Sequence, residues 1–134
     1  MTAQLSETDR ELLKGKNFAH LTTLGTDGDP ISTVLWVDED GGDIVMNTVM
    51  GRIKQGNIAR DPRVAVSVHG QDNPQISMAV VGVATLEHER AEETIDRLTK
   101  KYTGQDKYPA EWRGPGEERV TIRVRPQGIH RYGY

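Results

Sequence analysis

The chain has 134 residues, no cysteine and a formal net charge of −3. Its length suits a single domain, residues 1–134, with a hydrophobic core of its own. The lack of cysteine excludes disulfides, thiolate nucleophiles and iron–sulfur ligation, and the acidic balance argues against nucleic-acid or membrane partners. No apolar run approaches the roughly 20 residues that cross a bilayer, and the first residues do not resemble a signal peptide. The sequence therefore predicts a cytoplasmic protein.

The first half of the chain predicts one helix and then three short strands. Ser6 precedes acidic residues, which is typical of a helix start, and Gly15 marks the end of that helix. Asp27-Gly28 favours a tight hairpin turn because these residues tolerate positive φ angles, and Asp40 to Asp43 has the same character. The strands joined by these turns are expected at 18–24, 30–37 and 44–46.

The second half predicts two more helices among further strands. A helix is expected from Gly51 to Arg60, and a second over 89–102, where apolar residues repeat at helical spacing. Gly82 suggests a bend or bulge in a long strand. Between the second helix and the last strands lies a loop, 103–116, that contains Tyr108 and Trp112. The strands of this half are expected at 64–68, 75–87, 119–125 and 129–134. Alternation in 119–125 places the valines inward and the arginines, Arg119 among them, outward.

These elements together predict a mainly β fold with flanking helices. Six or seven strands linked mostly by hairpins pair antiparallel, and a sheet of this many strands tends to close into a barrel. No internal repeat or linker divides the chain.

A cationic segment follows the third strand. Arg52, Lys54, Arg60 and Arg63 stand against the single acid Asp61, in a chain that is acidic overall. Free N–H groups at a helix start, reinforced by nearby cations, suit a phosphate. Positions 52 and 54 lie about 200° apart in an ideal helix, so both reach one phosphate only if Arg52 precedes the first full turn. A glycine at position 51 favours such a loop. The alternative is an ordinary solvated cationic surface.

Motifs for other chemistries are absent. The sequence has no Gly-x-Gly-x-x-Gly, no His-Glu-x-x-His and no Gly-x-Ser-x-Gly, and Gly51 to Asn57 lacks the Lys-Ser/Thr ending of a P-loop. Its four histidines are scattered, so no metal site is expected. A small barrel with an anion site and no evident acid–base machinery suits a cofactor that carries its own chemistry.

Several segments resemble one family in the same order along the chain. The first hairpin, 18–30, is similar to that of the flavin-binding split β-barrel proteins, which include the pyridoxamine 5′-phosphate oxidase-like proteins and the coenzyme F420 (deazaflavin)-dependent reductases. The resemblance continues through Arg52-x-Lys54-x-x-Asn57, through 80–86 and through 119–124. It spans about residues 8 to 132, and the Arg-x-Lys-x-x-Asn element is most similar to the deazaflavin-using branch.

The resemblance implies a homodimeric split β-barrel with two cofactor sites at the subunit interface. It implies that the tricyclic ring lies against 34–37 and 46–48, that the anionic tail passes Arg52, Lys54 and Asn57, and that the other subunit contributes 75–78. The implied cofactor-binding residues are Val34, Trp36, Met46, Asn47, Thr48, Arg52, Lys54, Asn57, Gln75, Ser77 and Met78. Bulky Trp36 and apolar Val34 depart from relatives, so a relative's substrate preference is not carried over.

Other roles remain open for some of these residues. Trp36 suits a core or interface position as well as ring contact, and Asn47 and Thr48 suit a loop entry as well as hydrogen bonds to the ring. Tyr108 and Trp112 either cover a substrate or anchor their loop.

Three functions follow as hypotheses. The first is an F420-dependent reductase that passes a hydride to an electron-poor acceptor such as an enone or quinone; no residue stands out as its proton donor. The second is an oxidase or reductase with flavin mononucleotide (FMN), acting on a pyridoxine-type vitamer. The third is a non-catalytic carrier of a flavin-like cofactor.

Overall fold

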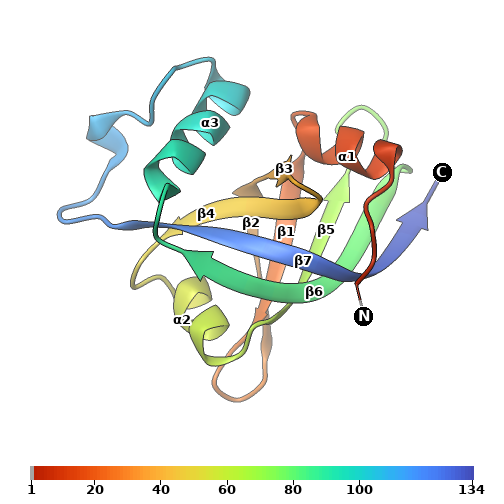
Figure 1. The fold of residues 1–134 in the computed structure, drawn as a ribbon, viewed down its shortest axis with the longest axis horizontal. Coiled ribbons are helices and arrows are strands. Elements are labelled where there is room, and N and C mark those ends of the chain that lie inside the picture. The colour runs from red at the N-terminus through yellow and green to blue at the C-terminus, as the bar shows by residue number, and fades with distance from the viewer. Residues whose placement is uncertain (1) are drawn as a thin grey trace.

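The structure is a computed structural model that describes residues 2–134 as one antiparallel sheet with three α-helices (Figure 1). The seven strands lie in the order β2-β1-β5-β6-β7-β4-β3. They are β1 Phe18–Leu24, β2 Pro30–Trp36, β3 Asp38–Asp40, β4 Asp43–Val49, β5 Arg63–His69, β6 Ser77–Glu87 and β7 Arg119–Tyr132. The helices are α1 Glu7–Lys14, α2 Ile53–Arg60 and α3 Ala91–Thr103, with a short 3₁₀ turn at Ala110–Trp112.

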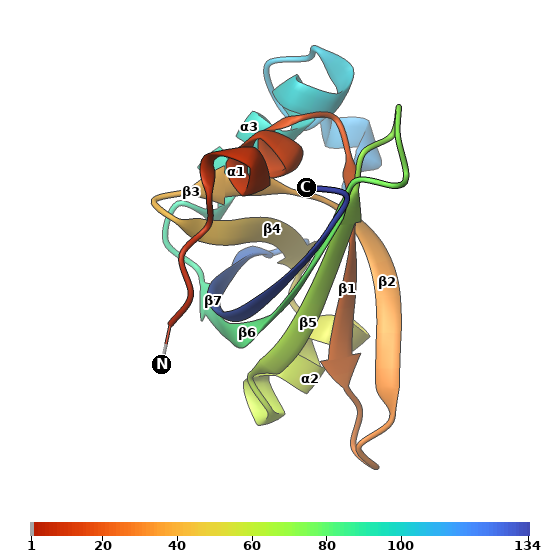
Figure 2. The same cartoon turned by 90° about the vertical axis from the view of Figure 1, so that its right-hand side faces the viewer.

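The sheet curls into a half-barrel (Figure 2). Only Val37 separates β2 from β3, yet β2 pairs with β1 and β3 pairs with β4. The chain therefore changes hydrogen-bonding partner at Val37, and β2 and the β3–β4 hairpin lie at opposite edges of the sheet. The expected antiparallel sheet of six or seven strands is confirmed, and β3 is the strand that the sequence reading missed. The interior is filled by apolar side chains such as Leu21, Met46 and Val80.

The helices lie around this half-barrel. In both views α1 lies at one end of the curled sheet and α2 at the other, while α3 packs outside β4 and β7 (Figures 1 and 2). The expected start of α1 is confirmed, because Ser6 is its N-cap and forms a reciprocal capping box with Asp9. The expected hairpin turns are also confirmed, with Gly28, Gly41 and Gly42 all at positive φ.

Two features of β6 and β7 bear on the expectations. The predicted irregularity at Gly82 is confirmed as a register shift between Val81 and Gly82. A Cβ at Gly82 would lie 2.4 Å from the carbonyl oxygen of Arg125, so only glycine allows this close approach. The two strands expected at 119–125 and 129–134 are one continuous strand, because the bulge lets β7 bend and continue its pairing with β6.

The carboxylate of Asp9 joins the first helix to the end of the chain. Asp9 has no solvent exposure. Arg131 donates to it at 2.6 and 3.0 Å, Tyr134 donates its hydroxyl at 2.5 Å, and the backbone N–H of Ser6 donates at 2.8 Å. Burial by itself raises the pKa of Asp9, but these hydrogen bonds outweigh it and lower the pKa to about 2. The ionised carboxylate is therefore the form that the fold stabilises.

Helix α3 bridges the gap between β2 and β4. At its first residue, the Ala91 carbonyl accepts a hydrogen bond of 2.9 Å from the Asn47 side chain on β4. In its last turn, the Tyr102 hydroxyl accepts from the Val37 N–H at 3.1 Å, and Lys101 donates to the Val37 carbonyl at 2.5 Å. Both sides of the gap are thus fastened to one rigid helix.

Candidate functional site

A pocket of about 350 Å³ lies between β2 and β4. The end of β2, the end of β4, the start of α2, the middle of α3 and the loop after α3 all contribute to it. The lining residues are Phe18, Val34, Leu35, Trp36, Asn47, Thr48, Val49, Arg52, Lys54, Ile95, Leu98, Tyr108 and Arg119. The walls are thus mostly apolar or aromatic, with a few polar groups, which is typical of small-molecule sites.

Every charged residue that lines this pocket is a cation. Arg52, Lys54 and Arg119 contribute positive charge, and no carboxylate is present in the lining. Burial and the nearby Arg52 together lower the pKa of Lys54 below its usual value. Among the described residues no carboxylate pairs with either Arg52 or Lys54. Two adjacent cations without a counter-charge favour an anionic ligand.

The start of α2 meets the condition derived from the sequence. Helix α2 begins at Ile53, two residues later than expected, so Arg52 is its N-cap in extended conformation and Lys54 lies in its first turn. Gly51 has a φ of +93°, the left-handed conformation that permits this entry. Arg52 therefore precedes the helix, and both side chains line one pocket.

Arg119 is a pocket residue that the sequence reading missed. Alternation along the strand placed it outward, toward solvent, but it is only 9% exposed because α3 and the following loop cover that face. Its Nε donates to Glu117 at 3.0 Å, its Nη1 lies 3.4 Å from the Asn47 side-chain oxygen, and its guanidinium stacks 4.4 Å from the centre of the Tyr108 ring. In the sequence, the only feature that could have indicated its place in the pocket is the nearby loop 103–116, which contains Tyr108 and Trp112.

The aromatic wall belongs to a three-ring stack. The Trp36 ring lies 5.2 Å from that of Tyr102 and nearly parallel to it, and Tyr102 stacks on Phe18 at 5.4 Å. Trp36 and Phe18 line the pocket, whereas Tyr102, which stacks on both, does not. Burial raises the pKa of Tyr102 to about 12, so its hydroxyl remains a neutral structural group. Trp36 therefore combines a packing role with a place in the pocket wall.

The structure brings together six of the eleven residues expected to bind the cofactor. Val34, Trp36, Asn47, Thr48, Arg52 and Lys54 all line the pocket. Met46 and Met78 are instead fully packed in the core.

The other three expected residues also lie outside this pocket. The Asn57 side chain donates to Thr23 at 3.0 Å and accepts from Arg60 at 2.8 Å, so it fastens α2 to β1. Gln75 and Ser77 stand at the start of β6. Their expected contribution from a second subunit stays a prediction.

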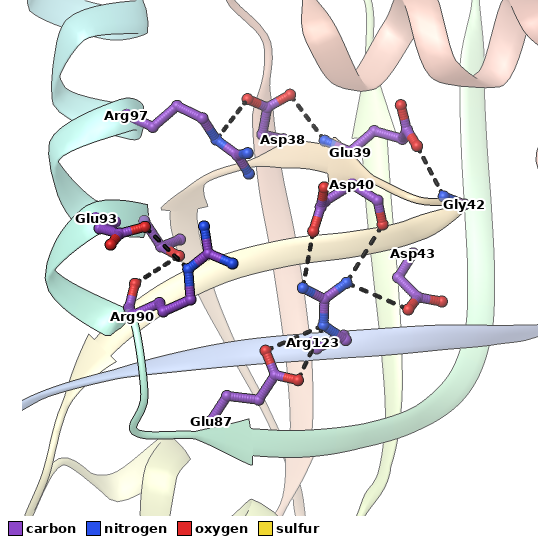
Figure 3. A network of polar contacts seen from close by, with 11 residues as sticks. Asp38, Glu39, Asp40, Gly42, Asp43, Glu87, Arg90, Glu93, Arg97 and Arg123 are labelled. Atoms are coloured by element: carbon purple, nitrogen blue, oxygen red, sulfur yellow. Dashed lines mark hydrogen bonds and ion pairs between the residues drawn. The ribbon is translucent and has the colours of Figure 1, made fainter.

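A larger cavity, about 730 Å³, is lined by the first turns of α3 and by residues of β3, β4, β6 and β7, and several of its lining residues belong to the polar network shown in Figure 3. Its central Arg123 donates to Asp40 at 2.8 Å and to Glu87 at 3.1 Å, and lies 3.3 Å from Asp43. Arg90 likewise pairs with a neighbouring glutamate. Because the arginines that line this cavity already have carboxylate partners, the network holds α3 against the strands and offers no unpaired arginine to a ligand. The smaller pocket, with its uncompensated cations, is the better candidate site.

The residues of the smaller pocket fit a flavin-like group. A flat ring system with polar edges suits the apolar walls together with Asn47 and Thr48, and a phosphate suits Arg52 and Lys54 at the helix start. FMN and F420 both present a tricyclic ring and a phosphate, so this fit does not distinguish them. Among the described residues no group of three or more metal-ligating side chains occurs, and no helix is long and apolar enough to span a membrane.

Comparison with solved structures places this chain among related folds. It is similar to an F420 reductase at 29% identity, with a TM-score of 0.78 over 90% of this chain and 94% of that one. It is also similar to Rv2991, a conserved hypothetical protein from Mycobacterium tuberculosis, at 25% identity, with a TM-score of 0.74 over 95% and 84% of the two chains. A third structure, a putative pyridoxamine 5′-phosphate oxidase from Listeria innocua, shares the fold at 23% identity and a TM-score of 0.64, over 85% and 86%.

Sequence comparison agrees with this likeness. No protein with a curated description matches the chain. The family model described as pyridoxamine 5′-phosphate oxidase matches residues 5–132, which is nearly the whole sequence. The chain therefore belongs to the pyridoxamine 5′-phosphate oxidase family, whose members include flavin- and F420-binding proteins.

Proposed function

We propose that this protein is a coenzyme F420-dependent oxidoreductase that reduces electron-poor organic acceptors. The observation that carries the proposal is the pair of uncompensated cations, Arg52 and Lys54, at the entry of α2 in a pocket whose other walls are apolar and aromatic. The likeness to an F420 reductase at 29% identity supports the choice of deazaflavin over FMN.

Each part of the pocket has a task in this proposal. Arg52, Lys54 and the free N–H groups at the start of α2 hold the phosphate of the cofactor. Val34 and Trp36 on one side and Asn47 and Thr48 on the other hold its ring. When bound, the reduced deazaflavin supplies the hydride, and the protein supplies orientation and a site from which water is excluded.

Equilibrium titration of the purified protein with F420 and, separately, with FMN tests the cofactor choice. Micromolar or tighter F420 binding, with FMN at least about tenfold weaker, is the expected result, and the reduced complex should then be oxidised by an enone or a quinone. Tighter FMN binding would move the protein to the flavin-dependent alternative. F420 binding without turnover of any acceptor would favour a carrier.

We also propose that the protein is a homodimer whose interface borders the cofactor site. By register, β2, β1, β5, β6 and the end of β7 share one outer face, with Val34, His20, Ser67, Ala79 and His130 in a row across it. Val34 is 60% exposed, and Val81 and Tyr132 on the same face are 48% and 60% exposed. A second copy of this chain would bury these apolar side chains and, because Val34 also lines the pocket, would close one side of the site.

Sedimentation velocity should give a mass twice that of one chain for the unchanged protein. Val81→Glu places a charge in the middle of this face and should yield a monomer, because burying two symmetry-related carboxylates is costly. Trp112→Glu, an exposed aromatic in the loop after α3, is the matched control and should remain dimeric. A monomeric unchanged protein, or a dimer that tolerates Val81→Glu, would contradict the proposed interface.

A further inference from the structure

Arg119 has a donor that the protein does not use. Its Nε is bonded to Glu117 and its Nη1 contacts Asn47, but among residues 2–134 no group accepts a hydrogen bond from Nη2. This nitrogen is not sealed in the interior, because the buried side-chain atoms without a partner among the described residues are Thr33 Oγ1 and Thr121 Oγ1. Arg119 lines the candidate pocket and its Nη2 is not fully buried, so this nitrogen is available to a ligand bound there.

The surroundings of Arg119 hold the guanidinium in place. The Arg119 and Glu117 side chains are 8% and 7% exposed, so their ion pair is almost fully buried. The Tyr108 ring covers one face of the guanidinium at 4.4 Å. Glu117 also lies 3.7 Å from Arg113, which is tied to α3 through Glu92. A donor fixed in this way is preorganised, so it needs little rearrangement when a ligand arrives.

The charge balance indicates which kind of ligand suits this donor. Arg52 and Lys54 have no carboxylate partner and suit a permanent anion, whereas Glu117 balances most of the charge of Arg119. A buried guanidinium that Glu117 already balances gains less from a phosphate than the unpaired Arg52 and Lys54 do. It is well suited to a neutral carbonyl oxygen that acquires negative charge during the reaction, which is the task of an oxyanion-hole donor.

We propose that Arg119 determines acceptor specificity by donating, through Nη2, to the carbonyl oxygen of a conjugated carbonyl substrate. This inference rests on the proposed function. Addition of the hydride forms a C–H bond at the β-carbon of the acceptor, breaks its carbon–carbon π bond and moves that electron pair toward the carbonyl oxygen. Arg119 holds the resulting enolate oxygen, and water then protonates the α-carbon. The acceptor gains two electrons and the cofactor loses them.

Two measurements on Arg119→Met test the proposal. The first is calorimetric binding of 4-nitrophenolate, an aromatic oxyanion, and of nitrobenzene, a neutral molecule of similar shape, to protein saturated with oxidised F420. The unchanged protein should bind the oxyanion about tenfold more tightly, and Arg119→Met should lose that preference. The second is turnover of cyclohex-2-enone, which should fall about 100-fold in the variant.

Two further variants make these results specific. Arg125→Met removes an exposed arginine from the same strand and should leave both measurements unchanged. Arg119→Lys keeps a positive charge beside Glu117, so the fold should be preserved. Its ammonium group replaces the planar guanidinium, so the variant should recover only part of the oxyanion preference. F420 affinity should stay within about threefold in all three variants.

Each remaining outcome counts against the proposal in a distinguishable way. If Arg119→Met keeps both the oxyanion preference and the turnover, Arg119 does not contact the acceptor. If its F420 affinity falls in parallel with turnover, the open donor belongs to the cofactor site. If the unchanged protein does not bind F420, the proposed function fails and the role of Arg119 fails with it.

Discussion

Replacing Arg52 and Lys54 together by methionine should weaken F420 binding about 1000-fold. Each charge-assisted hydrogen bond to a phosphate is worth about 2 kcal/mol, and about 4 kcal/mol corresponds to three orders of magnitude in Kd. Methionine retains most of the apolar stem of each side chain, so the loss isolates the charge and the donors. Fluorescence titration at fixed ionic strength measures it, because exposed charges are screened by salt.

The same double substitution should stabilise the free protein slightly. Burial and the charge of Arg52 lower the pKa of Lys54, so holding two cations together destabilises the folded protein when no anion is bound.

The matched control for the binding prediction is Arg10→Met with Lys16→Met. It removes the same charges from exposed positions on and beside α1, away from the pocket. An equal loss of affinity in the control would mean that overall charge, and not this site, attracts the cofactor.

Asp9→Asn should lower the free energy of unfolding at pH 7 by about 3 kcal/mol. Asparagine preserves the shape of the side chain but leaves Arg131 without its buried counter-charge and offers Tyr134 a weaker acceptor. Urea unfolding followed by circular dichroism measures the change. Asp72→Asn, in the exposed loop between β5 and β6, is the control and should stay within about 0.5 kcal/mol of the unchanged protein.

The pH dependence of this effect has a definite sign. The pKa of Asp9 is about 2 in the folded protein against 3.8 for the free side chain. The carboxylate therefore contributes its full stabilisation above pH 3.8, and that contribution declines as the pH falls through about 2. The shift corresponds to about 2 kcal/mol. The difference between the unchanged protein and Asp9→Asn should accordingly shrink by about that amount between pH 5 and pH 2, and a constant difference would contradict the assignment.

Local sequence patterns predicted much of this fold because the relevant forces act locally. Asp27-Gly28 identified its hairpin, since few other residue pairs accept positive φ there. Ser6 identified the start of α1 through its hydroxyl, and the Arg52–Lys54 arrangement followed from helix geometry together with the freedom of Gly51. In each case the deciding interaction lies within a few residues of the pattern.

The remaining features depend on contacts between distant segments. Alternation placed Arg119 outward correctly, but only the packing of α3 on that face makes it a buried pocket residue. Met46 directly precedes the pocket residues Asn47 and Thr48 in sequence, yet its side chain packs in the core with no solvent exposure. Asn57 shares a helix face with Lys54, but its short side chain ends at Thr23. A single sequence carries no local signal for such partners.

The fastening of Val37 and Asn47 to opposite ends of α3 has a consequence for how this family can diversify. A helix of 13 residues, about 20 Å long, sets the separation of the two strand ends independently of what lines the opening between them. Side chains that line this opening, such as Leu35 and Tyr108, can therefore change without altering the separation of the two strands. In the proposed function, substitutions in the loop after α3 can then change the acceptor preference while Arg52 and Lys54 keep the phosphate site at the start of α2.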